Sequence, residues 1–223
     1  MELQLENIGY TYNGKDMVLN DVNYTFENRK IYAIVGKSGA GKTTLLSLLS
    51  QLTKPTAGKI SYNGEDISDI DPYEFRSKVV GVIFQSFNLL PNLTAAENVE
   101  LSMDIAGVKK ENNHAYVMDL LEKVGLQEDE ANRRILKLSG GQQQRVAIAR
   151  ALSYDPDIIL ADEPTGNLDE DTQDEIMTIF HSLAYEEGKC IIIVTHSPLV
   201  AQSADYVYEL QPLKTVKKNM RRK

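Results

Sequence analysis

The stretch from Gly36 to Thr43, GKSGAGKT, has residue types and spacing that suit it to hold a chain of phosphates. It fits the pattern G-x-x-x-x-G-K-[ST], between an apolar run that predicts a strand and a run that predicts a helix. Glycines let backbone N–H groups turn toward phosphate oxygens, and the helix start adds a partial positive charge. We expect Lys42 to contact the β- and γ-phosphates and the Thr43 hydroxyl to bind Mg²⁺. A glycine-rich turn without a ligand is the alternative, which the rarity of the pattern disfavours.

Two adjacent acids, Asp162 and Glu163, end an apolar run from Asp157 that predicts a buried strand. Asp162 is suited to hold the water shell of Mg²⁺, and Glu163 to act on an attacking water as a general base. Neighbours on a strand point to opposite faces, but both carboxylates can reach one site because the strand ends here. Such a pair alone is often only a solvated loop, so its weight comes from its combination with the P-loop.

A third motif, LSGGQQQR from Leu138 to Arg145, places a serine and two glycines at the predicted start of a helix. Ser139 is suited to cap the helix, and Gly140 and Gly141 leave N–H groups free, which makes a second anion-binding helix start. One phosphate group does not need two such cradles from the same direction. The economical explanation is that this start completes a site on another copy of the chain.

Strand-like and helix-like runs alternate along the chain, which predicts an α/β fold with a mainly parallel sheet covered on both faces. The middle of the chain, about 86–151, reads as a helical insertion, with Thr94 and Glu97 at the spacing of a capping box. Asn63-Gly64 predicts a tight turn. The predicted strands are 1–12, 30–36, 78–85, 157–162, 190–195 and 205–210, and the main predicted helices are 43–52, 111–124 and 171–184.

The composition is that of an ordinary globular chain: 223 residues, 42% hydrophobic and 25% charged. This length predicts one domain, with or without an inserted subdomain. The formal net charge of −8 argues against a sequence-independent nucleic-acid partner, which would need clustered Lys and Arg. The one cysteine, Cys190, excludes an intrachain disulfide and reads as core. We expect no membrane span and no signal peptide, and therefore a chain kept inside the cell.

The last ten residues, 214–223, hold six cations and no acids. This basic C-terminal tail reads as a frayed, solvated terminus. The alternative is a surface that touches anionic lipid headgroups at the cytoplasmic face of a membrane.

Six motifs in order, GKSGAGKTT, Gln85 after a strand, LSGGQQQR, ILADEP, GNLD and VTH, resemble the ATP-binding subunit of an ATP-binding cassette (ABC) transporter. LSGGQ is the diagnostic motif, since other P-loop enzymes lack it. The resemblance implies an ATPase with a P-loop NTPase (RecA-like) core, an antiparallel β part and an inserted α-helical subdomain at about 86–152, all within a single domain of residues 1–213. It also implies a head-to-tail homodimer that holds two ATP molecules, with Mg²⁺, between the P-loop of one subunit and the signature of the other.

The same resemblance assigns residues. Tyr12 would stack on adenine, with Tyr10 a weaker candidate and simple packing the alternative. Glu163 would be the catalytic base and His196 the switch at the γ-phosphate, with a structural histidine as its alternative. The phosphates would be held by Gly36, Ser38, Gly39, Ala40, Gly41, Lys42, Thr43 and Thr44; Mg²⁺ would be bound by Thr43, Gln85 and Asp162, with Gln85 also catalytic; the opposite subunit's nucleotide would meet Ser139, Gly140, Gly141, Gln142 and Asp169.

Two stretches, FQSFNLLPNLTAAENVEL and LADEPTGNLD, resemble those of the lipoprotein-releasing, macrolide-exporting and bacitracin-resistance group of ABC proteins. This implies a motor at the cytoplasmic face of the membrane that drives a separate permease for export, antimicrobial-peptide resistance or mechanotransmission. The alternatives are a cell-division type that regulates a wall hydrolase, an amino-acid importer subunit, and a soluble ABC ATPase. Phe87, Leu89 and Leu90 would either receive a coupling helix of the permease or pack in the helical subdomain.

Overall fold

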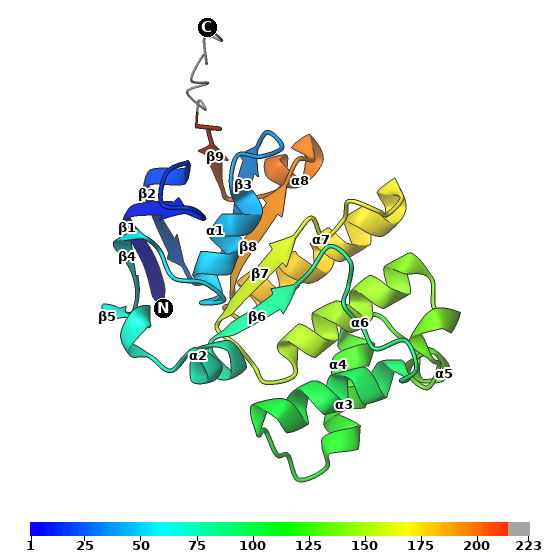
Figure 1. Ribbon diagram of the computed structural model, residues 1–223. Helices are drawn as coiled ribbons and strands as arrows, with labels where there is room; N and C mark the ends of the chain where they lie inside the picture. The colour runs from blue at the N-terminus through cyan, green and yellow to red at the C-terminus, as the bar shows by residue number, and fades with distance from the viewer. Residues whose placement is uncertain (214–223) are drawn as a thin grey trace, which may run out of the picture.

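Five parallel strands form the central sheet of the computed structural model, which describes residues 1–213 (Figure 1). Their order is β6-β7-β8-β3-β9, so strands distant in sequence lie side by side. The strands are β3 (Lys30–Gly36), β6 (Val80–Ile83), β7 (Ile158–Asp162), β8 (Cys190–Thr195) and β9 (Tyr206–Leu210). The basic tail, residues 214–223, lies outside the described residues.

A second, antiparallel sheet has the order β2-β1-β4-β5. Its strands are β1 (Glu2–Thr11), β2 (Met17–Glu27), β4 (Ala57–Tyr62) and β5 (Glu65–Asp66). The turn at Asn63-Gly64 joins β4 to β5, with both residues at positive φ, as a tight hairpin requires. Strand β2 is not predicted by the sequence pattern. Its pattern is broken by register shifts against β1 and by Asp21 at φ 53°, which hide the alternation of a regular strand.

Helices cover both faces of the central sheet, and the predicted fold class is confirmed. The helical part, α3 to α6, lies to one side of the strands (Figure 1). The helices are α1 (Lys42–Leu49), α2 (Pro72–Lys78), α3 (Ala95–Ala106), α4 (Asn113–Lys123), α5 (Glu128–Ala131), α6 (Gly140–Leu152), α7 (Glu170–Tyr185) and α8 (Pro198–Gln202), with 3₁₀ turns at Ile67–Asp69 and Ile135–Lys137. Within residues 1–213 no helix combines the length and the apolar character needed to cross a membrane.

Helix ends follow local chemistry. Thr94 and Glu97 form the expected capping box at the start of α3. The helix expected over 43–52 ends earlier, at Leu49, because Gln51 adopts φ 54° and turns the chain away. The residues between β6 and α3 form no helix, so the helical part begins later than the expected residue 86.

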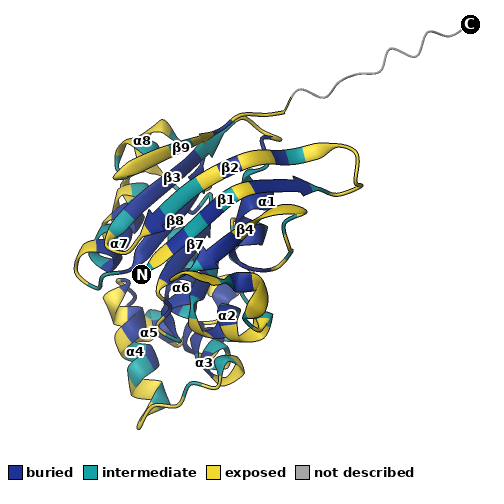
Figure 2. Ribbon diagram, turned by 90° about the vertical axis from the view of Figure 1, so that its left-hand side faces the viewer, coloured by how far each residue is buried: buried dark blue, intermediate teal, exposed yellow. Residues whose placement is uncertain are grey.

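Successive residues of the central strands face two separate cores, as the period of two requires. On β8, Ile191 and Ile193 lie in the core built with α3, α4, α6 and α7, whereas Ile192 and Val194 lie in the core built with α1 and the antiparallel sheet. Cys190 belongs to the second core, as expected, and burial raises the pKa of its thiol. Figure 2 shows β7 and β8 buried and exposed stretches on β2 and β9.

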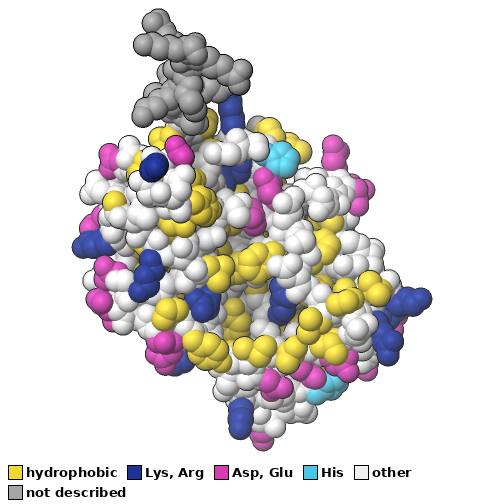
Figure 3. Space-filling view, viewed as in Figure 1, with side chains coloured by type: hydrophobic (Ala, Val, Ile, Leu, Met, Phe, Trp, Pro, Cys, Tyr) yellow, Lys and Arg dark blue, Asp and Glu magenta, His cyan; other side chains and the backbone are white. Residues whose placement is uncertain are grey.

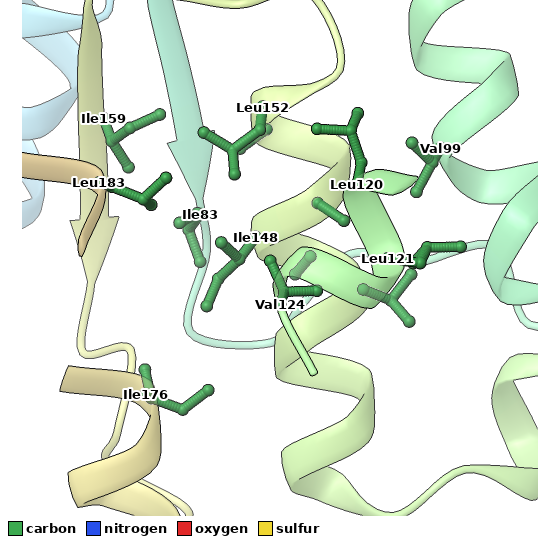
Figure 4. Close-up of a cluster of buried hydrophobic side chains, with 14 of the residues drawn as sticks. Ile83, Val99, Leu120, Leu121, Val124, Ile148, Leu152, Ile159, Ile176 and Leu183 are labelled. Atoms are coloured by element: carbon green, nitrogen blue, oxygen red, sulfur yellow. The ribbon is translucent and has the colours of Figure 1, made fainter. Parts of the chain in front are cut away.

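Helix α6 is the bridge between the sheet and the other helices. Its Ile148 and Leu152 pack between the strand residue Ile83 and the leucines 120 and 121 of α4 (Figure 4). Met103 is fully buried and Met118 packs against the same core. This packing therefore fixes the position of α6 relative to the central sheet.

An aromatic cluster joins the two sheets. Phe26 of β2 is fully buried and meets Tyr32 of β3 edge-to-face at 5.0 Å and Tyr208 of β9 at 5.6 Å between ring centroids. Tyr24 stacks on Tyr208 at 4.1 Å. These contacts hold the antiparallel sheet, and with it the turn that carries Tyr12, against the central sheet.

We predict that Phe26→Ala lowers the free energy of unfolding by about 3–5 kcal/mol, since it empties a buried ring site between two sheets. Urea denaturation measures the loss. Met17→Ala on the same strand is the control and should change stability by less than about 0.5 kcal/mol, because Met17 is exposed. Equal effects of the two substitutions would contradict the role of the aromatic cluster.

Candidate functional site

The loop from Gly36 to Lys42 connects β3 to α1, as the sequence predicts. Gly39 and Gly41 adopt φ 79° and 97°, which residues with a side chain rarely adopt. A Cβ at Gly41 would lie 2.8 Å from Leu19, so the loop also needs glycine for space. No side chain caps the N-terminus of α1, which leaves its first N–H groups directed at the loop.

This loop opens on a cleft of about 450 Å³. The cleft gathers residues from six separate stretches of the chain: five lie at the ends of β1, β3, β6, β7 and β8, and the sixth lies on β2. It is lined by Tyr12, Val18, Ser38, Gly39, Gly41, Lys42, Thr43, Thr44, Gln85, Asp162, Glu163 and His196. All but Val18 were singled out from the sequence. Val18 was missed because it lies on β2, whose irregular pattern gave no strand signal.

Gly36 and Ala40 belong to the loop but not to the lining of the cleft. Ala40 is buried, and a Cβ at Gly36 would come within 2.6 Å of the Leu210 carbonyl oxygen. The close packing of these two residues therefore supports the loop. Contact of their backbone N–H groups with phosphate remains a prediction.

Lys42 and Thr43 are the first two residues of α1, and their side chains make different contacts. The Lys42 Nζ donates to the Gly36 carbonyl oxygen at 2.7 Å, so the ammonium lies over the loop. The Thr43 Oγ1 donates to Asp162 Oδ2 at 3.4 Å. Burial and the neighbouring Glu163 raise the pKa of Asp162, against the lowering effects of Thr43 and Lys42. Ionisation of Asp162 therefore costs free energy in this cleft, and a bound cation would offset that cost.

Glu163 has an unusual backbone. Its φ of 46° is left-handed, a conformation that non-glycine residues rarely adopt and that concentrates at functional sites. Its N–H donates to the Val194 carbonyl oxygen at 2.9 Å, which continues the pairing of β7 with β8. The Glu163 side chain contacts His196, the residue that directly follows β8.

The Glu163 carboxylate contacts His196 through both oxygens. Oε1 lies 2.8 Å from His196 Nδ1, and Oε2 accepts the His196 backbone N–H at 3.2 Å. The Glu163 side chain is 12% exposed and that of His196 71%. The pairing orients the imidazole of His196, which also lines the cleft.

Tyr12 stands at the outer end of the cleft, 73% exposed. Its hydroxyl lies 2.9 Å from the Thr44 Oγ1, and its ring meets Tyr10 edge-to-face at 4.9 Å. These two contacts fix the ring and leave a face free for an aromatic partner. Tyr10 is buried, which leaves Tyr12 as the candidate at this position.

Gln85 is exposed and follows β6 by two residues. Its amide lies beside Gly166, where an added Cβ would be 3.9 Å from Gln85 Nε2. The glutamine therefore enters the cleft from the strand next to the one that carries Asp162.

The second helix start lies outside this cleft. Ser139 caps α6 in a capping box with Gln142, and Gln142 Nε2 also donates to Glu130. Asp169 caps α7 through the Thr172 N–H at 3.0 Å, which lowers the pKa of Asp169. A Cβ at Gly141 would come 2.7 Å from Thr172, so the starts of α6 and α7 are in contact.

The donor set of the cleft fits Mg²⁺ bound together with phosphates. Thr43, Asp162 and Gln85 offer oxygen ligands, which Mg²⁺ prefers. Residues 1–213 hold no group of three His, Cys, Asp or Glu that could bind a metal alone. Such a cation would therefore need further oxygens from a bound phosphate chain.

Comparisons with known proteins agree on one family. The sequence model of the family described as ABC transporter matches residues 19–166. YclH of Bacillus subtilis (strain 168), named an uncharacterized ABC transporter ATP-binding protein, is 49% identical over 204 residues, covering 91% of this chain and 90% of YclH. MacB of Syntrophobacter fumaroxidans, named a macrolide export ATP-binding/permease protein, is 41% identical over 217 residues, covering 94% of this chain but 30% of MacB.

A solved structure has the same fold. It is the ATP-binding cassette MJ0796, described as a dimer in a post-hydrolysis state bound to ADP and Pi. The TM-score is 0.85 at 37% sequence identity, and the match covers 95% of this chain and 97% of that chain.

We predict that Asp162→Asn raises the melting temperature of the ligand-free protein by roughly 1–3 °C. The folded state raises the pKa of Asp162, so the ionised carboxylate costs stability at neutral pH, and this cost disappears only as the pH falls below the raised pKa. Thermal denaturation at pH 7 in EDTA measures the change. Asp69→Asn, at an exposed position, should leave the melting temperature unchanged, and a lower melting temperature for Asp162→Asn would contradict the strain assigned to this site.

Proposed function

The chain belongs to the ABC transporter family, and we propose that it is the subunit that binds and hydrolyses ATP to drive a separate membrane permease. One observation carries the proposal: a single cleft joins a P-loop, a metal-suited aspartate and a histidine-bound glutamate. The second helix start lies apart from them, as a site shared by two copies would require.

The phosphates of ATP would lie on the N–H groups of the loop and the start of α1. The loop residues of this role are Gly36, Ser38, Gly39, Ala40, Gly41, Lys42, Thr43 and Thr44. Lys42 would exchange its carbonyl contact for phosphate oxygens, and Tyr12 would stack on adenine. Mg²⁺, held by Thr43, Asp162 and Gln85, would neutralise charge on the phosphates as a Lewis acid.

Glu163 would act as the general base. Its carboxylate takes the proton of an attacking water while the water oxygen bonds to the γ-phosphorus and the bond to the ADP oxygen breaks. The contacts to His196 orient the carboxylate, and His196, which lines the same cleft, would lie beside the γ-phosphate. Gln85, which lines the same cleft, would help to position the water.

A second copy would complete the site. Ser139, Gly140, Gly141, Gln142 and Asp169 lie at the contacting starts of α6 and α7, outside the chain's own cleft. The N-terminus of the 13-residue helix α6 would present its N–H groups to the γ-phosphate held by the other copy. The dimeric state of the similar cassette MJ0796 supports this homodimer.

The permease would dock beside Gln85, at the cytoplasmic face of the membrane. Hydrophobic side chains cross the face between the strands and the lower helices in Figure 3. Tyr73, Leu90 and Ile105 are exposed on α2, the Gln85 loop and α3, whereas Phe87 and Leu89 pack against the core. The relative MacB, which is named as both macrolide export ATP-binding protein and permease, supports a permease partner and an export role. Peptide resistance and mechanotransmission are the other roles that we propose for such a motor.

We predict that Glu163→Gln binds ATP, forms a stable dimer and hydrolyses ATP at least about a hundredfold more slowly, because the amide cannot accept the proton. Light scattering on a sizing column with ATP and Mg²⁺ measures the dimer, and phosphate release measures turnover. Lys42→Ala is the control and should remain monomeric under the same conditions. Turnover by Glu163→Gln at the unsubstituted rate would remove Glu163 from its role.

The ATP-locked Glu163→Gln protein also tests the partner. Added to native membrane extract, it should retain an integral-membrane protein, which mass spectrometry identifies. Retention of ribosomes or DNA with no membrane protein would reject the permease partner and favour a soluble ABC ATPase.

A further inference from the structure

The segment that follows Gln85 has a strained backbone. Phe87 and Asn88 adopt φ 59° and 52°, two consecutive left-handed conformations in residues other than glycine. Such conformations persist only where the surroundings hold them. The local hydrogen bonds are short-range: Phe87 N–H donates to the Phe84 carbonyl at 3.0 Å, and Asn88 N–H to the Ser86 carbonyl at 2.6 Å. These turns alone do not attach the segment to the rest of the fold.

Arg150, in the last turn of α6, supplies that attachment. Its Nη1 donates to the Asn88 carbonyl oxygen at 2.5 Å and its Nη2 to the Phe87 carbonyl oxygen at 2.8 Å. The two strained residues are therefore held by the two arms of one guanidinium. An ammonium group could not reach both carbonyls with the same fixed geometry.

The charge of Arg150 has no acidic partner among residues 1–213. The guanidinium is partly buried, and burial lowers its pKa. A desolvated cation without a carboxylate is costly, so the carbonyl oxygens of Phe87 and Asn88 are its main compensation. The guanidinium and the two strained peptide groups therefore depend on one another.

Asn98 of α3 holds the same segment from the other side. It is buried, and its side chain accepts the Leu90 N–H at 2.8 Å and donates to the Leu90 carbonyl at 3.2 Å. Residues 87–90 are thus bound to the helical part, whereas β6, which ends at Ile83, is bound to the sheet. Gln85 lies at the joint between them.

We propose that Arg150 is a positioning residue that ties Phe87 and Asn88 to α6, so that displacement of α6 moves Gln85 in the cleft. The proposal rests on the proposed function, since it gives α6 a route from the dimer-facing helix start to the metal side of the same subunit's cleft. Arg150 itself touches no reacting atom. It acts through the backbone of the segment and thereby on Gln85.

Two substitutions test the proposal in the full chain. Arg150→Ala removes both donors, and Arg150→Lys keeps the charge but not the fork. We expect both to bind ATP within about twofold of the unsubstituted protein by calorimetry, to lower kcat about tenfold or more, and to require several-fold more Mg²⁺ for half-maximal rate. Guanidinium chloride at a non-denaturing concentration should restore part of the rate of Arg150→Ala and none of Arg150→Lys.

Arg133→Ala is the matched control, because Arg133 is an exposed arginine of the helical part that pairs only with Asp129 one turn away. Arg133→Ala should leave ATP binding, kcat and the Mg²⁺ dependence of the rate as in the unsubstituted protein, and guanidinium chloride should not raise its rate. The proposal is overturned if the Arg150 variants keep the rate and Mg²⁺ dependence of the unsubstituted protein. It is also overturned if they lose ATP binding and melting temperature together with rate and guanidinium restores nothing, since that is a purely structural role.

Hydrogen exchange gives a readout that does not depend on activity. In both Arg150 variants the amides of Phe87, Asn88 and Leu90 should exchange faster than in the unsubstituted protein and in Arg133→Ala. Unchanged exchange would overturn the attachment. If the unsubstituted chain hydrolyses no ATP, the proposed function fails, and the exchange result still decides whether Arg150 holds this segment.

Discussion

The parallel pairing of β3, β7 and β8 decides where the chemistry of this chain lies. In this register Ile34 and Asp162 both pair with Val194, so the three strands end at nearly the same level. The P-loop follows the first strand, Glu163 the second and His196 the third. Since carboxyl ends of parallel strands share one edge of a sheet, these groups meet in one cleft without any long loop to bring them there.

The two hydrophobic cores stabilise the carboxyl edge of the parallel sheet, where several local conformations and charges are unfavourable by themselves. Glu163 has a left-handed backbone, Asp162 has a raised pKa, and two glycines of the P-loop adopt positive φ. The first two features cost free energy in the ligand-free state, whereas glycine adopts positive φ without strain. The strands beneath are buried on both faces, so the cores can hold the edge in this arrangement. A site built in this way is preorganised for a cation and an anion that would relieve its strain.

Helix α6 connects the two places where a nucleotide would be bound. Its first turn carries the serine and glycines that face away from the chain's own cleft, and its last turn carries Arg150. Along its length, Ile148 and Leu152 pack on the strand β6 that leads to Gln85. Since packed helices move as rigid bodies, a change at one end of α6 has a physical path to the other.

The chemistry of the individual motifs and the alternation of the central strands with helices could be predicted from the sequence, because both depend on short stretches of chain. The P-loop, the acid pair and the capped start of α6 are local patterns, and eleven of the twelve residues that line the cleft were singled out from them. The domain limits and the roles of the site residues remain predictions. Only the tertiary structure decided that Glu163 holds His196 with both oxygens, that Tyr12 binds Thr44, that Val18 joins the cleft and that Arg150 reaches Phe87 and Asn88. These contacts join residues that are distant in sequence, and they depend on strand register and helix packing, which no local pattern encodes.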